Sequence, residues 1–151
     1  MKPTSTRKST ARGPLAAENA CPACGKVMVE KHSKLSFPVN GEDVAVPHMA
    51  HLACPKCHEI VLRMDDARRL REGALDLYRE KYNLLSADEI RGLRERLRLT
   101  QSALARLLRL GVNTISRWEA GRNIQTSAMD VLLRLVRDVP DSLAYLKKHA
   151  A

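Results

Sequence analysis

The chain has 151 residues, enough for one ordinary domain or two small ones. Its 26 Lys and Arg against 17 Asp and Glu give a formal net charge of +9, which favours a polyanionic partner. Only 3% of residues are aromatic, so Leu, Val and Ala must fill the core, which favours helices. No apolar run approaches the roughly 18 residues of a membrane span, and residues 1–20 lack the apolar centre of a signal peptide. We therefore expect a cytoplasmic protein with no membrane partner and reduced cysteines.

The first two segments are a tail and a β-rich region. Residues 1–20 are basic, rich in Ser and Thr and poor in bulky apolar residues, which predicts a flexible tail. Residues 21–64 contain short alternating stretches around Asn40-Gly41, a pair that tolerates positive φ and so predicts a tight hairpin turn. This segment has too little apolar material to fold alone and needs a staple.

The rest of the chain reads as helical. Residues 65–85 predict a connecting helix to about Tyr82, capped by Asp65 or Asp66, and a short joint. Residues 86–151 predict five helices. Their start and stop signals are the capping box of Ser86 and Glu89, the N-caps Thr100 and Thr126, the glycine before the third helix, and Pro140. The expected fold class is therefore α+β, with a small β-rich domain before an all-α domain.

Four cysteines form two CxxC pairs, and they are Cys21, Cys24, Cys54 and Cys57. An x2 spacing lets two thiolates of one tight turn face a point where tetrahedral zinc needs sulfurs about 3.7 Å apart. We therefore predict one structural Zn²⁺ that clamps the two ends of the hairpin region. A redox dithiol is the alternative, but the pattern shows neither a CxxC at a helix start nor a βαβ unit. A catalytic zinc with one ligand from His48, His51 or His58 is a further alternative, and we expect these histidines to be surface or outer-shell groups.

The stretch from about Ile90 to Leu135 resembles the Cro/C1-type helix-turn-helix family. The matching residues are Arg94, Leu99, Thr100, Gln101, Ala105, Ile115, Ser116, Trp118, Glu119 and Gly121. The chain departs from the family at Arg98 and Arg109, two turn positions where the family often has glycine. An arginine there must adopt the left-handed conformation at about 1 kcal/mol.

The resemblance makes residues 112–120 the helix that enters the major groove. On a helical wheel Val112, Ile115, Trp118 and Glu119 share one side, and Asn113, Thr114, Ser116 and Arg117 share the other. Trp118 is then a core anchor. Arg pairs with guanine O6 and N7, and Asn with adenine N6 and N7, so Arg117 and Asn113 are the expected base-reading residues.

Further contacts and an internal ion pair complete the expected site. DNA-backbone or secondary contacts are expected from Thr100, Gln101, Ser102, Thr114, Ser116 and Arg122. Glu119 lies on the buried side and needs a partner, which the family resemblance supplies as Arg94.

A zinc module followed by a Cro/C1-type helix-turn-helix resembles the MqsA-type (YgiT-type zinc finger) antitoxin family. This resemblance implies a homodimer through the C-terminal domain, a ribonuclease-type toxin bound by the zinc domain, and repression of the shared operon. A dimer would read double-stranded DNA at a palindromic operator. A stand-alone zinc-containing regulator without a toxin is the alternative. An enzyme is not expected, because the sequence has no Ser/His/Asp set, carboxylate pair or phosphate-binding loop, and Cys21 or Cys24 is the sole redox candidate.

Overall fold

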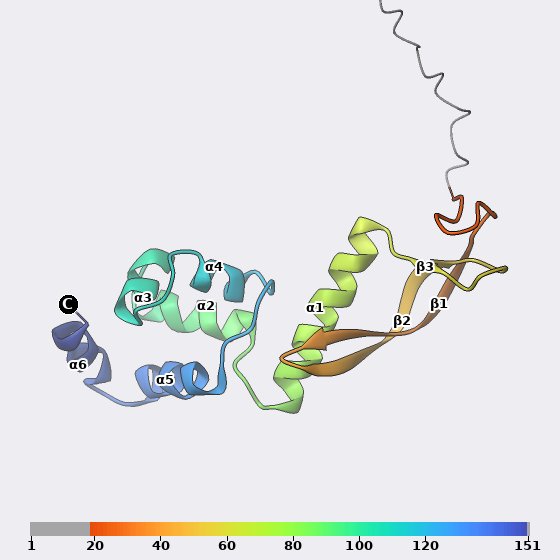
Figure 1. Cartoon of the computed structure of the whole chain (residues 1–151). Coiled ribbons are helices and arrows are strands. Elements are labelled where there is room, and N and C mark those ends of the chain that lie inside the picture. Colours follow the sequence, from red (N-terminus) through yellow and green to blue (C-terminus); the bar gives the residue numbers. More distant parts are fainter. Residues whose placement is uncertain (1–18, 151) are drawn as a thin grey trace, which may run out of the picture.

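The computed structural model describes residues 19–150 and has an α+β fold, as predicted. The strands are β1 (Val29–Val39), β2 (Glu42–Ala53) and β3 (Ile60–Val61), and the helices are α1 (Met64–Lys81), α2 (Ala87–Arg96), α3 (Gln101–Leu107), α4 (Thr114–Glu119), α5 (Ser127–Asp138) and α6 (Ser142–His149). The sheet and α1 form one lobe, and α2 to α6 form the other (Figure 1). The predicted tail of residues 1–20 falls almost entirely outside the described residues, which begin at Asn19.

The sheet is antiparallel, with the order β1-β2-β3. Asn40 and Gly41 have φ angles of 50° and 84°, which confirms the tight turn predicted at this pair. A bulge shifts the register farther along, where Ser33 lies opposite Met49 but Leu35 lies opposite Val46. His48 takes a left-handed φ of 54° at this point, which bends the hairpin between its tip and the cysteine-bearing end.

The hairpin obtains its missing core from α1. Val39, Val44, Val46 and Met49 of the hairpin share one cluster with Leu70, Ala74 and Leu75 of α1. Gly73 permits the close approach, because a Cβ there would stand 3.2 Å from a methyl group of Val46. Burial of this apolar surface joins α1 to the sheet as one unit.

The predicted aspartate cap of α1 is wrong. The helix begins at Met64, its N-cap is Arg63, and no side chain caps it. Asp65 and Asp66 therefore lie inside the first turn, where their negative charges interact favourably with the positive end of the helix dipole. Both pair there with arginines one turn later.

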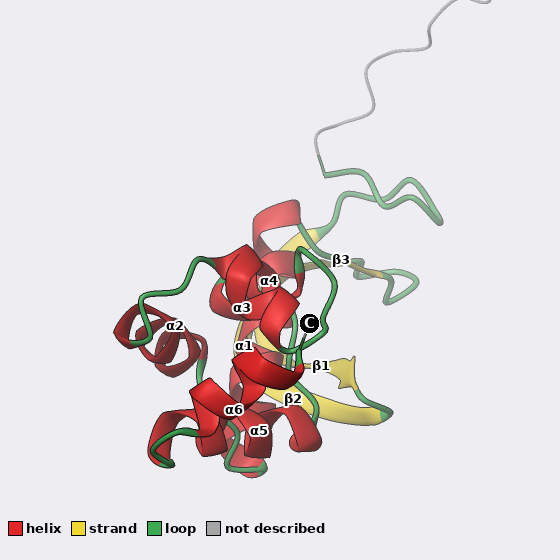
Figure 2. Cartoon of the chain, turned by 90° about the vertical axis from the view of Figure 1, so that its left-hand side faces the viewer, coloured by secondary structure: helices red, strands yellow, loops and turns green. Residues whose placement is uncertain are grey.

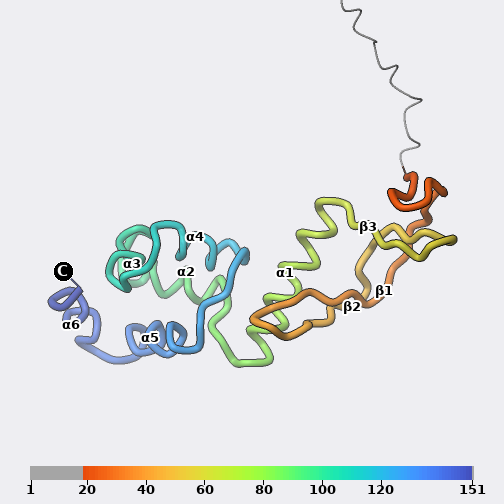
Figure 3. Tube along the Cα trace, viewed as in Figure 1, coloured from red at the N-terminus to blue at the C-terminus, as the bar shows by residue number. Residues whose placement is uncertain are grey.

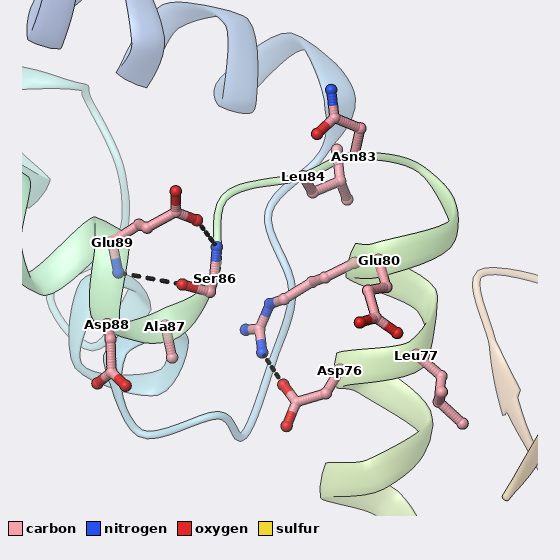
Figure 4. A pocket seen from close by; sticks show the side chains of 10 residues that line it. Asp76, Leu77, Glu80, Asn83, Leu84, Ser86, Ala87, Asp88 and Glu89 are labelled. Carbon is pink, nitrogen blue, oxygen red and sulfur yellow. Dashed lines mark hydrogen bonds and ion pairs between the residues drawn. The ribbon is translucent and has the colours of Figure 1, made fainter.

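The other helix starts follow the sequence signals. Ser86 accepts from the Glu89 backbone N–H, and the Glu89 side chain accepts from the Ser86 N–H, so the capping box is present (Figure 4). Thr100 and Thr126 cap α3 and α5 as predicted. Arg98 and Arg109 both adopt φ of 53°, which confirms that two non-glycine residues occupy the left-handed turn positions.

The joint between the lobes, residues 83–85, is held by hydrogen bonds to α5 and to the segment just before it. Asp130 Oδ1 accepts from the Leu85 N–H at 2.7 Å, and Gln125 Nε2 donates to the Leu85 carbonyl at 2.7 Å. Arg134 bridges Asp130 and the Asn83 carbonyl. The chain passes from α1 through this joint to α2 and returns beside it before α5 (Figure 3). Viewed from the helical end, α2 to α6 lie in front of the sheet (Figure 2). The joint is therefore a packed segment with fixed partners.

Candidate metal centre and nucleic-acid interface

The two CxxC pairs meet at one point, at the end of the hairpin away from its turn. All four Sγ atoms lie within 4.8 Å of one another. Cys21 and Cys57 are 3.5 Å apart and Cys24 and Cys54 are 3.4 Å apart, so each close contact joins one pair to the other. These separations are far longer than a disulfide bond and close to the sulfur spacing of a tetrahedral metal thiolate site, about 3.7 Å.

The two pairs sit on turns with the same backbone hydrogen bonds. Gly25 N–H donates to the Cys21 carbonyl at 2.9 Å, and His58 N–H donates to the Cys54 carbonyl at 3.1 Å. Gly25 and His58 have matching left-handed φ angles of 73° and 63°. His58 is thus the backbone counterpart of Gly25, a role that the sequence did not reveal because histidine seldom adopts this conformation.

The four thiols influence one another's ionisation. Hydrogen bonding from the Cys57 backbone N–H lowers the pKa of Cys54 to about 6. The Glu59 backbone N–H lowers the pKa of Cys57, but contact with Cys54 and loss of hydration outweigh it and raise that pKa to about 12. One thiolate therefore stabilises the protonated form of its neighbour, and four thiolates together need a positive ion at their centre.

The donor set fits a closed metal site. Four thiolates fill a tetrahedral coordination sphere and leave no open position for catalysis. Among the histidines considered, His48 and His58 are exposed, and buried His51 engages the Met49 carbonyl through Nδ1. Neither pair opens a helix, and the sheet is antiparallel, so the features of a redox dithiol are missing from the described residues.

The second candidate site is the surface of α4. Ile115, Trp118 and Glu119 face inward and are at most 4% exposed, and Trp118 is the core anchor that the sequence predicts. Asn113 and Arg117 are exposed, Asn113 as the N-cap and Arg117 on the helix. The predicted inward position of Val112 is wrong, because α4 begins only after Asn113 and Val112 in the preceding turn is 73% exposed.

Glu119 lies at the centre of a buried polar network. Arg94 Nε and Nη2 donate to its two carboxylate oxygens at 2.6 and 3.0 Å, and Gln101 Nε2 donates at 2.8 Å. Burial raises the pKa of Glu119, but the hydrogen bonds from Arg94 and Gln101 outweigh it and leave the pKa below its usual value. Arg94 also donates to the Leu99 carbonyl in the turn before α3. The network around this ion pair therefore holds α2, α3 and α4 in their positions relative to one another.

The remaining predicted DNA contacts differ in how free their side chains are. Ser102 and Arg122 are exposed, and Thr114 is partly buried. Other side chains are engaged within the protein: Thr100 caps α3, Gln101 binds Glu119, and Ser116 Oγ donates to the Asn113 carbonyl at 3.0 Å.

Two arginines that the sequence did not single out hold the end of α4. Arg91 of α2 donates to the Glu119 carbonyl at 2.9 Å, and Arg79 of α1 donates to the carbonyls of Trp118 and Asn123. The resemblance carried no signal for Arg79, because that residue precedes the matching stretch and reaches α4 only in the folded chain.

The fold and the cysteine centre together define a class of small proteins in which a four-thiolate site on a β-hairpin precedes a bundle of short helices. A family model described as the antitoxin component of bacterial toxin-antitoxin system, MqsA, matches residues 19–147. The chain is also 30% identical over 93 residues to Antitoxin HigA-2 of Vibrio cholerae serotype O1. The matched region covers 58% of this chain and 89% of that protein. The chain belongs to the MqsA antitoxin family, and is thus an antitoxin with a regulatory role. No helix in residues 19–150 is long and apolar enough to cross a bilayer.

Proposed function

We propose that this antitoxin is a dimeric, zinc-containing repressor that binds the operator of its own operon and neutralises a toxin. One observation carries the DNA-binding part. Asn113 and Arg117 face solvent from a short helix whose other face is buried against α2 and α3. The polar face is thus free for a ligand while the buried face fixes its orientation.

In this proposal α3 and α4 form a helix-turn-helix motif, and α4 enters the major groove. Arg117 donates to guanine O6 and N7, and Asn113 pairs with adenine N6 and N7. Ser102, Thr114 and Arg122 contact phosphates or neighbouring groups. Three other predicted contacts contribute indirectly, because their hydrogen bonds within the protein position α3 and α4; these are Thr100, Gln101 and Ser116. The +9 charge adds a sequence-independent attraction to DNA.

The metal in this proposal is one structural Zn²⁺, held by Cys21, Cys24, Cys54 and Cys57. Zinc suits four thiolates in tetrahedral geometry, and it neutralises much of their charge when bound. The cysteines would then link the two turns across the end of the hairpin. Within residues 19–150 the small core there is built on four buried residues, Cys21, Met28, Leu52 and Cys54, so the metal would supply much of its stability.

The proposed dimer forms through the C-terminal helices. Val131, Leu135, Val139 and Tyr145 are large apolar residues on and next to α5 and α6, and all are exposed. A second copy would cover this face with the same face of its own, as a two-fold interface requires. Two α4 helices about 34 Å apart would then meet successive major grooves of a palindromic operator.

The proposed toxin is a ribonuclease-type protein that binds the hairpin and zinc end. Family membership supports a toxin, and its binding site on this end is our inference. Co-expression with the product of the neighbouring reading frame tests it, since a complex should copurify and Cys57→Ser should weaken it. If the wild-type chain binds its operator but copurifies with no neighbouring product, the stand-alone regulator is the better description.

The DNA-binding proposal is tested by selecting duplexes from a random library with the wild-type chain. Arg117→Ala and Asn113→Ala should each weaken binding to the selected duplex by about 1–3 kcal/mol and leave binding to random DNA nearly unchanged. Arg96→Ala removes the same charge from α2, where Arg96 lines a cavity with Arg137 and Asp138 of the α5 side, and serves as the control. Equal loss on both duplexes would assign Arg117 to phosphate contact, and failure to enrich any sequence would overturn the proposal.

A further inference from the structure

Arg79 is the buried arginine among residues 19–150, with only 3% of its surface exposed. Arginine is rarely buried unless it is paired, and its acidic partner Asp76 has a side chain that is 70% exposed. The other hydrogen bonds of Arg79 go to main-chain carbonyls of the opposite lobe. Nη2 donates to Asn123 at 2.8 Å and to Trp118 at 3.4 Å. Arg79 and Asp76 both line a cavity of about 510 Å³ between α1 and the start of α2, and Figure 4 labels Asp76 and other residues of its lining.

Of the two carbonyls that Arg79 binds, that of Trp118 lies in the last turn of α4 and that of Asn123 lies in the segment that follows the helix. The last carbonyls of a helix lack partners within the helix, and a cation near them also interacts favourably with the negative end of the helix dipole. Arg79 and Arg91 approach this end from two different helices. Because α4 has only six residues, its own hydrogen bonds cannot hold its orientation, and outside contacts must.

A short path joins Arg79 to the proposed base-reading arginine. The Asn123 N–H donates to the Arg117 carbonyl at 3.3 Å, while the Asn123 carbonyl accepts from Arg79. Arg71 of α1 adds a parallel bond to the Arg122 carbonyl at 2.6 Å. Ile124 then packs into the cluster that α1 forms with the hairpin. The segment after α4 is therefore anchored to α1 at consecutive residues.

From this arrangement we propose that Arg79 is a positioning residue for DNA reading, so that α1 is part of the reader although it precedes the helix-turn-helix. The inference rests on the proposed function of α4. Arg79 touches no base. It fixes the C-terminal end of α4, and so the direction in which Arg117 leaves the helix. Bidentate recognition of guanine is directional, and a tilt of α4 costs discrimination before it costs folding.

The test is a double-mutant cycle on the full chain, with a duplex selected by the wild-type chain and a scrambled duplex. Arg79→Met keeps the stem of the side chain and removes the guanidinium. We expect about 10-fold weaker binding to the selected duplex, the discrimination that one bidentate pair provides, and less than about 2-fold change on the scrambled one. In an Arg117→Ala background the same substitution should change binding by less than about 2-fold, because the residue it positions is gone. Arg69→Ala, an exposed arginine of α1 whose charge partner is Asp66, is the control and should bind like wild type.

The outcomes distinguish failure of the positioning role from failure of the proposed DNA-binding function. Additive losses from Arg79→Met and Arg117→Ala, or unchanged selectivity in Arg79→Met, would overturn the positioning role. If no duplex is selected at all, the proposed DNA-binding function fails, which is a different result. Should Arg79→Met not fold, Arg79→Lys keeps the charge but has a single nitrogen, which cannot bind the Asp76 carboxylate and the Trp118 and Asn123 carbonyls as Nη1 and Nη2 do together. It should lose selectivity with a melting temperature near that of wild type. Wild-type selectivity in Arg79→Lys would also contradict the inference.

Discussion

The buried ion pair of Arg94 and Glu119 predicts a large and specific loss of stability. Glu119→Leu would leave Arg94, whose side chain is 14% exposed, without the carboxylate that accepts two of its hydrogen bonds. Breaking a buried pair from one side costs about 3–5 kcal/mol, a large share of the roughly 5–15 kcal/mol that stabilises a typical domain. For a chain of this length we expect the melting temperature to fall by about 10 °C.

The measurement is urea unfolding followed by circular dichroism, at one protein concentration because the stability of the proposed dimer would depend on concentration. The double variant Arg94→Met, Glu119→Leu replaces both charges by apolar groups and should recover at least half of the loss. Asp138→Ala breaks a pair of neighbouring residues at the end of α5, in which the Asp138 side chain is 56% exposed, and is the control, with a change of less than about 1 kcal/mol expected. If the double variant loses the sum of the single losses, Arg94 and Glu119 do not interact and the reasoning is refuted.

Three further predictions concern the metal, pH and assembly. A zinc chelator should speed amide exchange in residues 20–29 and 52–61 while α2 and α5 stay protected, and uniform exchange would show that the metal also supports the helical lobe. Burial raises the pKa of Glu119 and Asp130, but hydrogen bonds outweigh it and lower both pKa values, so their stabilisation is complete above about pH 5 and is lost as pH falls below about 4. Urea midpoints measured from pH 7 to pH 3 should therefore fall less steeply in Glu119→Gln than in wild type, and parallel curves would contradict this assignment. Leu135 lies on the face of the proposed dimer interface, so Leu135→Glu should be monomeric in light scattering while wild type and the exposed control Arg96→Ala are dimeric. A dimeric Leu135→Glu would place the interface elsewhere.

Signals that act over a few residues were readable from the sequence. The capping box at Ser86, the caps at Thr100 and Thr126, and the Asn40-Gly41 turn all depend on neighbours within about four residues. The two CxxC pairs also predicted that the four cysteines lie together, because thiolates at this spacing can bind one metal ion and the hairpin between the pairs returns the chain.

Features that depend on tertiary contacts escaped the sequence. Arg79 looks like an ordinary charge on an amphipathic helix, and only the arrival of residues 118–123 beside α1 buries it. A helical wheel that starts at Val112 predicts a buried side chain there, but Val112 lies in the turn before α4, which begins at Thr114. Helix α1 likewise begins at Met64, one residue before Asp65, so neither aspartate occupies the N-cap position.

The central claim is that Arg117 reads a guanine, and replacement of guanine N7 in the selected duplex tests it most directly. A 7-deazaguanine at the contacted position lacks N7, one of the two guanine acceptors that a bidentate arginine binds, and leaves O6 in place. Fluorescence anisotropy should show about 10-fold weaker binding of the wild-type chain to the modified duplex, and no difference between the two duplexes for Arg117→Ala. Equal affinity of the wild-type chain for both duplexes at every guanine of the site would contradict the account.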